Sequence, residues 1–310
     1  MASVFPRTEA TAMSGRCPDV VVHTPWRGAP VVHRCRPVGV AARVPRATVG
    51  RMGNVMVCLP ASGGVGSTTL AAAVAVRAAA AGLGVVALDL DRAAGALDVV
   101  FGVEQDPGWR WADLEDVSGV VDGAALARRL PSSCGVAVLS GARDDGWRPP
   151  AEDPWLDIVP DVVAGLCESH DLVVVDLARD VGVLAAIGLL VDAAVVVLGS
   201  GVAELAAGAV VVPGVRRVLA TARDAGRPWQ EQPLLPIEPW AVIRGQRVEP
   251  DLEELVTDEL DVPVVAVVGN DRRLRAELAH GLPPGARGRG AVVRAADELL
   301  LRLTAQRAAA

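Results

Sequence analysis

The segment from Pro60 to Thr69 contains the residues whose types and spacing are best suited to hold a ligand. It reads Pro-Ala-Ser-Gly-Gly-Val-Gly-Ser-Thr-Thr and lies between an apolar run at 55–59 and an Ala/Val-rich segment at 70–81. The order strand, glycine loop, helix points consecutive backbone N–H groups toward one concavity at the positive end of a helix. Such a loop is shaped for the phosphates of a nucleotide.

Some loop residues would serve binding through their backbone and others through their side chains. Gly63, Gly64 and Gly66 let the backbone turn tightly and approach a ligand without a Cβ clash. Thr68 stands where a hydroxyl can reach a magnesium ion. The predicted cofactor-binding residues are Gly63, Gly64, Val65, Gly66, Ser67, Thr68 and Thr69.

The loop lacks the charged residue that phosphate-binding loops ordinarily contain. The pattern G-x-x-x-x-G-K-[ST] requires glycine at 61 and lysine at 67, whereas this chain has Ala61 and Ser67. No lysine occurs anywhere in the 310 residues, so arginine supplies every fixed positive side chain. The sequence therefore predicts a loop that still offers backbone N–H groups to phosphate but lacks the positive charge of the lysine.

Two further segments place carboxylates at the ends of apolar runs. Asp89 and Asp91 belong to the sequence Leu-Asp-Leu-Asp, and because residues i and i+2 face the same side of a strand, both could point toward the loop. Alternatively, one of them caps a helix that begins at residue 93 or 94. Asp176 ends the apolar run at 172–175 in the form of a Walker B carboxylate, which holds magnesium through water.

The fold class follows from a repeated alternation of apolar runs and helical patterns. Strands that are apolar throughout are typical of a parallel sheet buried on both faces. The sequence thus predicts an α/β protein with a doubly wound, mostly parallel sheet, helices on both faces, and ligands at the carboxyl ends of the strands. The predicted strands are 55–59, 85–90, 135–139, 172–177, 193–198, 240–243 and 262–268, with helices at 68–81 and 291–306 and a loop at 223–239.

Other aromatic and basic clusters give weaker signals. Trp109, Trp111 and Trp147 lie among Pro, Gly and Asp residues and are interpreted as covers of loop edges, with a partner surface as the alternative. The arginines around Arg272, Arg273 and Arg275 predict a solvated face, or else a contact with nucleotide, DNA or anionic lipid.

Residues 1–52 differ in composition from the segment 53–310. Arginine, proline and glycine are scattered through them with one Glu and one Asp, which predicts a basic, poorly ordered arm. Cys17, His23, His33 and Cys35 lie in this arm, but the His-x-Cys spacing is tighter than zinc motifs use.

Charge and cysteine usage bound the class of protein. The net charge of −7 argues against nucleic acid as a partner. Five cysteines without a C-x-x-C motif are typical of a reducing compartment. The opening residues lack the apolar run of a signal peptide, and the densest apolar stretch, 181–199, is interrupted by Asp192 and so too short to span a membrane. We expect a cytoplasmic protein without a transmembrane segment.

Taken in order, these motifs resemble the MinD/ParA group of P-loop ATPases, which carry a deviant Walker A motif. That motif is K-G-G-x-G-K-[ST], and residues 62–68 here read Ser-Gly-Gly-Val-Gly-Ser-Thr. The Leu-Asp-Leu-Asp at 88–91 is similar to the family's second-strand aspartate motif, and 170–176 is similar to its Walker B strand. The resemblance covers residues 53 to 305.

Within that group, the chain most resembles actinobacterial CpaE-like proteins with a degenerate loop. Ser62 and Ser67 replace both family lysines while the glycine core is kept. Those proteins, some called septum site-determining protein, occur with pilus or secretion machinery or act on division-site placement. They usually begin with a receiver-like domain, and the 52 residues before the sheet here are too few for a complete one.

The resemblance also implies ligands, roles and partners. It implies ATP or ADP with Mg²⁺ as cofactor, with Thr68 and Asp176 as magnesium partners, the latter through water, and Asp89 as a further metal candidate. Asp91 would be the catalytic residue that orients the attacking water. The family's adenine-side asparagine would fall near Arg244, a residue that does not support adenine recognition. Protein partners of the division or pilus/secretion machinery and a homodimer are expected, with membrane contact only through partners.

The expected energetic effects of the missing lysines favour weak nucleotide binding over efficient ATP hydrolysis. A hydrogen bond to a charged group contributes about 1.5 to 3 kcal/mol, so loss of a lysine contact weakens affinity roughly tenfold to a hundredfold. Each missing transition-state donor costs about 10² to 10³ in rate. We therefore expect a positioning or regulatory protein with little ATP turnover. The alternatives are a slow ATPase that uses Asp91 with an arginine in trans, a nucleotide-free scaffold, and ParA-like action on DNA.

Overall fold

The computed structural model describes residues 20–21, 32–33, 53–91, 95–115, 117, 119–141, 155–226, 236–245, 249 and 251–309. The chain divides into two units, Met1–Val40 and Ala41–Ala310. In the first unit, the two-residue strands β1 (Val20–Val21) and β2 (Val32–His33) pair antiparallel. The rest of the predicted basic arm, including Cys17, His23 and Cys35, lies outside the described residues.

The second unit is built on an eight-stranded sheet. Its order is β10-β9-β8-β3-β7-β4-β6-β5, and every pairing is parallel except that of β5 with β6. The strands are β3 (Asn54–Pro60), β4 (Val85–Asp89), β5 (Ser132–Ser133), β6 (Val136–Leu139), β7 (Leu172–Asp176), β8 (Ala193–Gly199), β9 (Trp240–Arg244) and β10 (Val264–Val268). The predicted doubly wound, mostly parallel sheet is confirmed.

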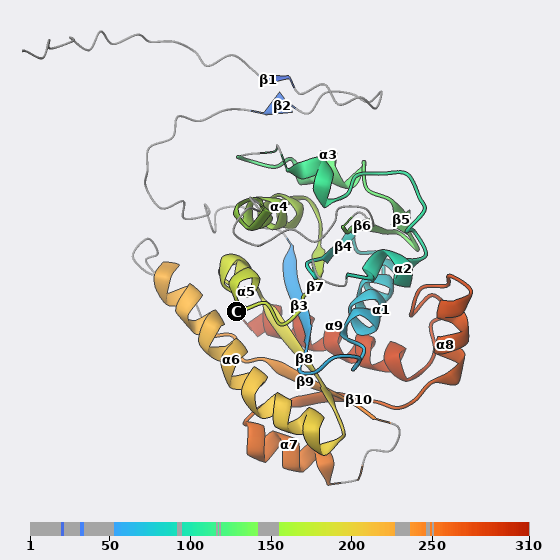
Figure 1. Cartoon of the computed structure of the whole chain (residues 1–310), viewed down its shortest axis with the longest axis vertical. Helices are drawn as coiled ribbons and strands as arrows, with labels where there is room; N and C mark the ends of the chain where they lie inside the picture. Colours follow the sequence, from blue (N-terminus) through green and yellow to red (C-terminus); the bar gives the residue numbers. More distant parts are fainter. Residues whose placement is uncertain are drawn as a thin grey trace, which may run out of the picture. The chain divides into compact units, whose positions relative to one another are not determined.

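Helices connect the strands and cover both faces of the sheet (Figure 1). They are α1 (Ser67–Ala80), α2 (Leu97–Phe101), the 3-10 helix η1 (Trp111–Leu114), α3 (Gly123–Ala127), α4 (Trp155–Ser169), α5 (Val181–Ile187), α6 (Val202–Gly226), α7 (Leu252–Leu260), α8 (Arg272–Ala279) and α9 (Ala291–Ala309). The helix expected after the glycine loop begins one residue earlier than predicted, at Ser67.

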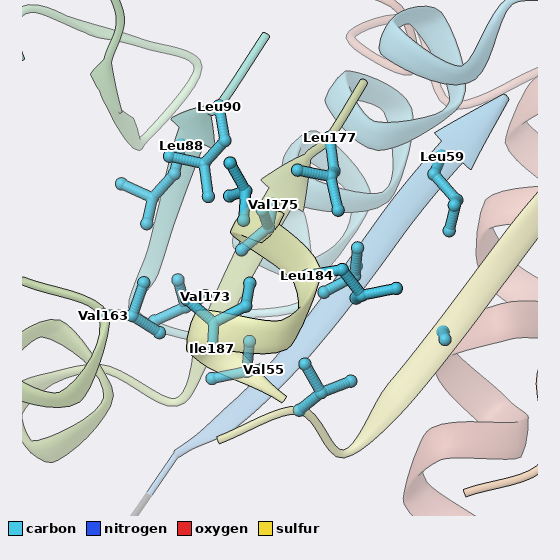
Figure 2. Close-up of a cluster of buried hydrophobic side chains, with 14 of the residues drawn as sticks. Val55, Leu59, Leu88, Leu90, Val163, Val173, Val175, Leu177, Leu184 and Ile187 are labelled. Atoms are coloured by element: carbon cyan, nitrogen blue, oxygen red, sulfur yellow. The ribbon is translucent and has the colours of Figure 1, made fainter. Parts of the chain in front are cut away.

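Alternation along the central strand β3 divides the core into two layers. Val55 and Val57 face a layer formed with α3 to α7, while Met56 and Cys58 face a layer formed with α1, α2 and α9. Figure 2 shows labelled side chains of β3, β4 and β7 meeting Leu184 and Ile187 of α5 in the first layer. Because both faces of β3 are buried, its apolar run is continuous.

The strand order places a crevice beside β3. The strands β7, β4 and β6 lie on one side of β3, and β8, β9 and β10 lie on the other. The chain crosses from one side to the other after β7, which makes this a topological switch point, where the carboxyl ends of parallel strands leave room for a ligand. The glycine loop follows β3 directly, so it lies at this crevice.

Helix α6 differs from the sequence-based expectation in two ways. It continues to Gly226, so residues 223–226 of the predicted loop are helical, while 227–235 lie outside the described residues. Among the described helices, residues 202–225 of α6 form the only segment that is long and apolar enough to cross a membrane, judged by length and composition alone. The mean hydropathy of this segment is 1.4. In the structure, its buried residues Val212, Val215 and Leu219 pack in the core layer of α3 to α7.

Candidate nucleotide site

The glycine loop keeps an open concavity at the start of α1. Gly66 is the residue before α1 and has φ +91°, and Gly64 has φ +77°, a left-handed conformation that favours glycine. No atom lies within 4 Å of the point where a Cβ would stand on Gly63 or Gly64. The loop is therefore open at these two glycines, and nothing in the described chain fills the space beside them.

Side chains around the loop connect it to the strand ends. The Thr68 side chain forms a hydrogen bond with the Asp176 carboxylate. The backbone N–H of Ala61 donates to the Val197 carbonyl of β8 at 2.9 Å, which fixes the loop's first residue to the sheet. At the position of a family lysine, the buried Ser62 Oγ has no hydrogen-bond partner among the described residues. The structure thus brings together Thr68 and Asp176, the two residues that the resemblance implies as magnesium partners.

Asp89 and Asp176 form a buried pair of carboxyl groups. They are opposite residues on the adjacent parallel strands β4 and β7, and each is 3% exposed. Burial raises the pKa of Asp89 to about 7 and that of Asp176 to about 8. The negative charge of Asp89 raises the pKa of Asp176 further, and the hydrogen bond from Thr68 opposes this shift. A cation at this edge of the sheet would favour the ionised forms.

Asp89 also organises the turn that leads to α2. Its Oδ1 accepts from the N–H of Asp91 at 3.1 Å, and its Oδ2 accepts from the N–H of Leu97 at 3.0 Å. A Cβ on Gly95 would stand 2.6 Å from Asp89 Oδ2, so only glycine fits there. The predicted helix start at 93 or 94 lies outside the described residues. Asp89 instead accepts from the N–H of Leu97, the first residue of α2, whose preceding residue Ala96 provides no side-chain cap.

Asp91 lies just beyond the end of β4, near the two buried carboxyl groups. Strand β4 ends at Asp89, so Asp91 lies in the following turn and is half-buried. Besides burial, the negative charge of Asp91 raises the pKa of both Asp89 and Asp176, so its carboxylate lies close to this pair even though Asp91 stands outside the strand.

Trp111 supports the end of β4 from the core. Its Nε1 donates to the Asp89 carbonyl oxygen at 2.8 Å, its side chain is buried, and its ring packs edge-on against Trp155 with centroids 5.6 Å apart. The interpretation of Trp111 as a loop-edge cover is therefore wrong. Trp109 is partly buried beneath the guanidinium of Arg129, and Trp147 lies outside the described residues.

A cavity of about 200 Å³ adjoins the loop on the side of β8, β9 and β10. Its lining includes Gly64 and Gly66 of the loop, Arg244 of β9, Asn270 two residues after β10, and Arg275 of α8. Sequence reasoning missed Asn270 and assigned Arg275 only to a basic cluster. Asn270 could have been predicted from its position two residues after a buried strand, because the carboxyl ends of the parallel strands meet at this edge of the sheet.

The residues at this edge fit a magnesium nucleotide better than a metal ion alone. The loop offers backbone N–H groups and open space, and the cavity continues beyond the loop. No group of three or more His, Cys, Asp and Glu side chains suited to a metal occurs in the described part of the chain. A magnesium ion here would take the Thr68 hydroxyl from the protein, with Asp176 holding one of its waters, and its remaining ligands from phosphate and water.

Among known proteins, the sequence relatives match only a short part of this chain. No family model matches the chain. Two uncharacterized proteins of Mycobacterium tuberculosis, from strains CDC 1551 / Oshkosh and ATCC 25618 / H37Rv, are each 39% identical over 94 residues. That match covers 30% of this chain and 26% of each relative, so it spans about a quarter of their length.

Solved structures match over most of the chain. A ParA family ATPase from Chlorobium tepidum TLS is 14% identical, covers 81% of this chain and 98% of its own, and has a TM-score of 0.64. MinD in the MinC:MinD complex of Aquifex aeolicus is 18% identical, with coverages of 80% and 96% and a TM-score of 0.55. The septum site-determining protein MinD of Pyrococcus horikoshii OT3, complexed with Mg-ADP, is 20% identical, with coverages of 80% and 96% and a TM-score of 0.51. The chain therefore has the MinD/ParA-like fold of P-loop NTPases.

Proposed function

We propose that this chain is a spatial-positioning or regulatory protein of the division and partition type that binds a magnesium nucleotide weakly and turns it over little. The observation that carries the proposal is the loop at 61–67, which keeps its left-handed Gly66 and its open concavity although both lysine positions are serine. A backbone cradle binds phosphate, whereas rapid cleavage needs side-chain donors placed for the transition state.

Each residue near the loop has a proposed part in binding. The N–H groups of residues 63 to 69 would cradle the phosphates, and Thr68 would contact the magnesium ion. Asp176 would hold that ion through water, and the charge of the ion would favour its ionised form. Bound Mg-ATP supplies a γ-phosphate whose presence or absence can be read by a partner. Asp91 is the residue that we propose orients the attacking water in any slow hydrolysis of ATP.

Partner and location are proposed from the resemblance and the structural neighbours. MinD of Aquifex aeolicus is in complex with MinC, and other neighbours are plasmid partition proteins. We propose protein partners in division-site, pilus or secretion placement, a homodimer, and a cytoplasmic location, in the manner of CpaE-like proteins. The net charge of −7 disfavours DNA as the surface on which this chain acts.

A single-turnover experiment tests the proposal. Protein in excess over labelled ATP and Mg²⁺ is sampled over time for bound nucleotide and for ADP formed. We expect bound ATP with hydrolysis at or near the rate without protein. Magnesium-dependent turnover as fast as that of lysine-bearing relatives, measured alongside, would contradict the regulatory assignment. If such turnover occurs and Asp91→Ala abolishes it, the chain is an enzyme.

A further inference from the structure

Arg244, the last residue of β9, reaches across the sheet edge to the glycine loop. Its Nη1 donates to the Gly64 carbonyl oxygen at 3.3 Å. Its Cδ and Nε lie 3.6 and 3.8 Å from the point where a Cβ would stand on Gly66. These two contacts place the guanidinium stem directly beside the part of the loop that turns in left-handed conformation.

The backbone of Arg244 is fixed while its side chain is exposed. The residue is paired with Gly199 of β8 and Val268 of β10, and its carbonyl accepts from the N–H of Ser200 at 3.1 Å. The guanidinium therefore starts from a rigid point at the carboxyl end of the sheet, two strands from β3. A cation on a strand end is better positioned than one on a free loop.

The charge of Arg244 is available for a ligand. Within the described residues it has no carboxylate partner, and only one of its five N–H groups donates to an acceptor, the Gly64 carbonyl. It also lines the cavity that adjoins the loop. A guanidinium suits phosphate because its planar fork donates two parallel hydrogen bonds.

We propose that Arg244 supplies to the phosphates of a bound nucleotide the positive charge that Ser62 and Ser67 cannot. This inference rests on the proposed function and assigns the cation to the chain itself, so none has to come from a partner. From the sequence alone, Arg244 is identified only as a residue that does not support adenine recognition. In the structure Arg244 contacts the loop, and its remaining N–H groups would donate to phosphate oxygens.

Binding measurements on matched variants test the inference. ADP, ATP and inorganic tripolyphosphate, each with Mg²⁺, are titrated into wild type, Arg244→Gln, Arg244→Lys and Arg217→Gln. Arg217 is exposed on α6, away from the loop, so its variant matches the charge change. We expect Arg244→Gln to weaken all three ligands about tenfold to a hundredfold, Arg244→Lys to recover part of the loss, and Arg217→Gln to match wild type. The loss should shrink at high salt.

The outcomes separate this inference from the function on which it rests. If wild type binds and Arg244→Gln binds equally well or better, the inference fails and the proposed function stands. If Arg244→Gln weakens ATP but not tripolyphosphate, Arg244 acts on the base, which also overturns the inference. If wild type binds none of the three ligands, both fail. Thermal unfolding of each variant confirms that a loss of binding is not a loss of folding.

Discussion

Asp89 and Asp176 lie opposite each other on the parallel strands β4 and β7, and both are almost completely buried. Two such carboxyl groups do not ionise together readily, because each loses its hydration and one repels the other. The pKa of Asp89 is about 7 and that of Asp176 about 8. Near neutral pH the pair therefore retains a proton for much of the time.

We predict that the nucleotide-free protein loses stability as pH rises. Both carboxyl pKa values are raised above the unfolded value of 3.8, so the folded state keeps protons that the unfolded state has lost. The contribution is fully present below pH 3.8 and is lost as pH rises through 7 and 8. For each group, every unit of difference between the folded and the unfolded pKa changes the free energy of unfolding by about 1.4 kcal/mol. Chemical denaturation at pH 5, 6, 7 and 8 measures the slope.

The variant Asp176→Asn should flatten that slope. It removes one titrating group and the negative charge that faces Asp89, so the loss in free energy of unfolding between pH 5 and 8 becomes smaller than in wild type. Asp258→Asn, an exposed change on α7, is the control and should keep the wild-type slope. A slope that Asp176→Asn leaves unchanged would show that the pair does not titrate as described.

Two glycines of the loop should respond differently to the same substitution. Gly66 has φ +91°, so Gly66→Ala forces alanine into left-handed backbone and should cost about 1 to 2 kcal/mol of stability. Gly63 does not have this conformation, and a Cβ there meets no atom within 4 Å. Gly63→Ala should leave stability unchanged or raise it by less than about 1 kcal/mol. Equal melting temperatures for the two variants would argue against the loop geometry.

The support that Trp111 gives to the end of β4 can be tested by one substitution. Trp111→Phe keeps an aromatic ring against Trp155 but removes the indole N–H donor together with buried volume, which adds a cavity cost to that of the lost bond. The Asp89 carbonyl would then lose a buried partner, at a cost of about 1 kcal/mol. Urea denaturation followed by circular dichroism gives the sum of the two costs. A variant as stable as wild type would show that the bond contributes nothing to the end of β4.

Thr68 should carry the magnesium dependence of nucleotide binding. In wild type we expect ADP to bind more tightly with Mg²⁺ than with a chelator. Thr68→Ala removes the hydroxyl that bonds Asp176, so most of this difference should disappear, whereas Thr68→Ser should retain it. Thr221→Ala, on the exposed side of α6, serves as the control. Undiminished magnesium dependence in Thr68→Ala would remove Thr68 from the proposed metal site.

The sequence predicted the sheet well because burial leaves a local signal. Every strand from β3 to β10 except β5 was found within two residues of its bounds, since a parallel sheet buried on both faces gives runs of Val, Leu and Ala. The two-residue β5 has no such run. Helix α8 was not predicted because it contains no buried residue, although Asp271 caps it by accepting from the N–H groups of Arg273 and Leu274.

Candidate site residues could be named from the sequence only where they form a local pattern. The loop glycines and Thr68 form one local pattern, and Asp176 ends a recognisable strand. Arg244 lies 180 residues from Gly64, so no local pattern could indicate their contact. The role of Asp89 in holding Leu97 likewise depends on a turn whose path is set by hydrogen bonds rather than by periodicity.

Calorimetric titration of the wild-type chain with Mg-ADP tests most directly whether a loop without lysine still binds phosphate through its backbone. The proposed function predicts saturable binding at roughly millimolar concentrations or below, weakened when Mg²⁺ is chelated. The absence of saturable heat at concentrations well above about 1 mM, from protein shown to be folded by its cooperative melt, would contradict it.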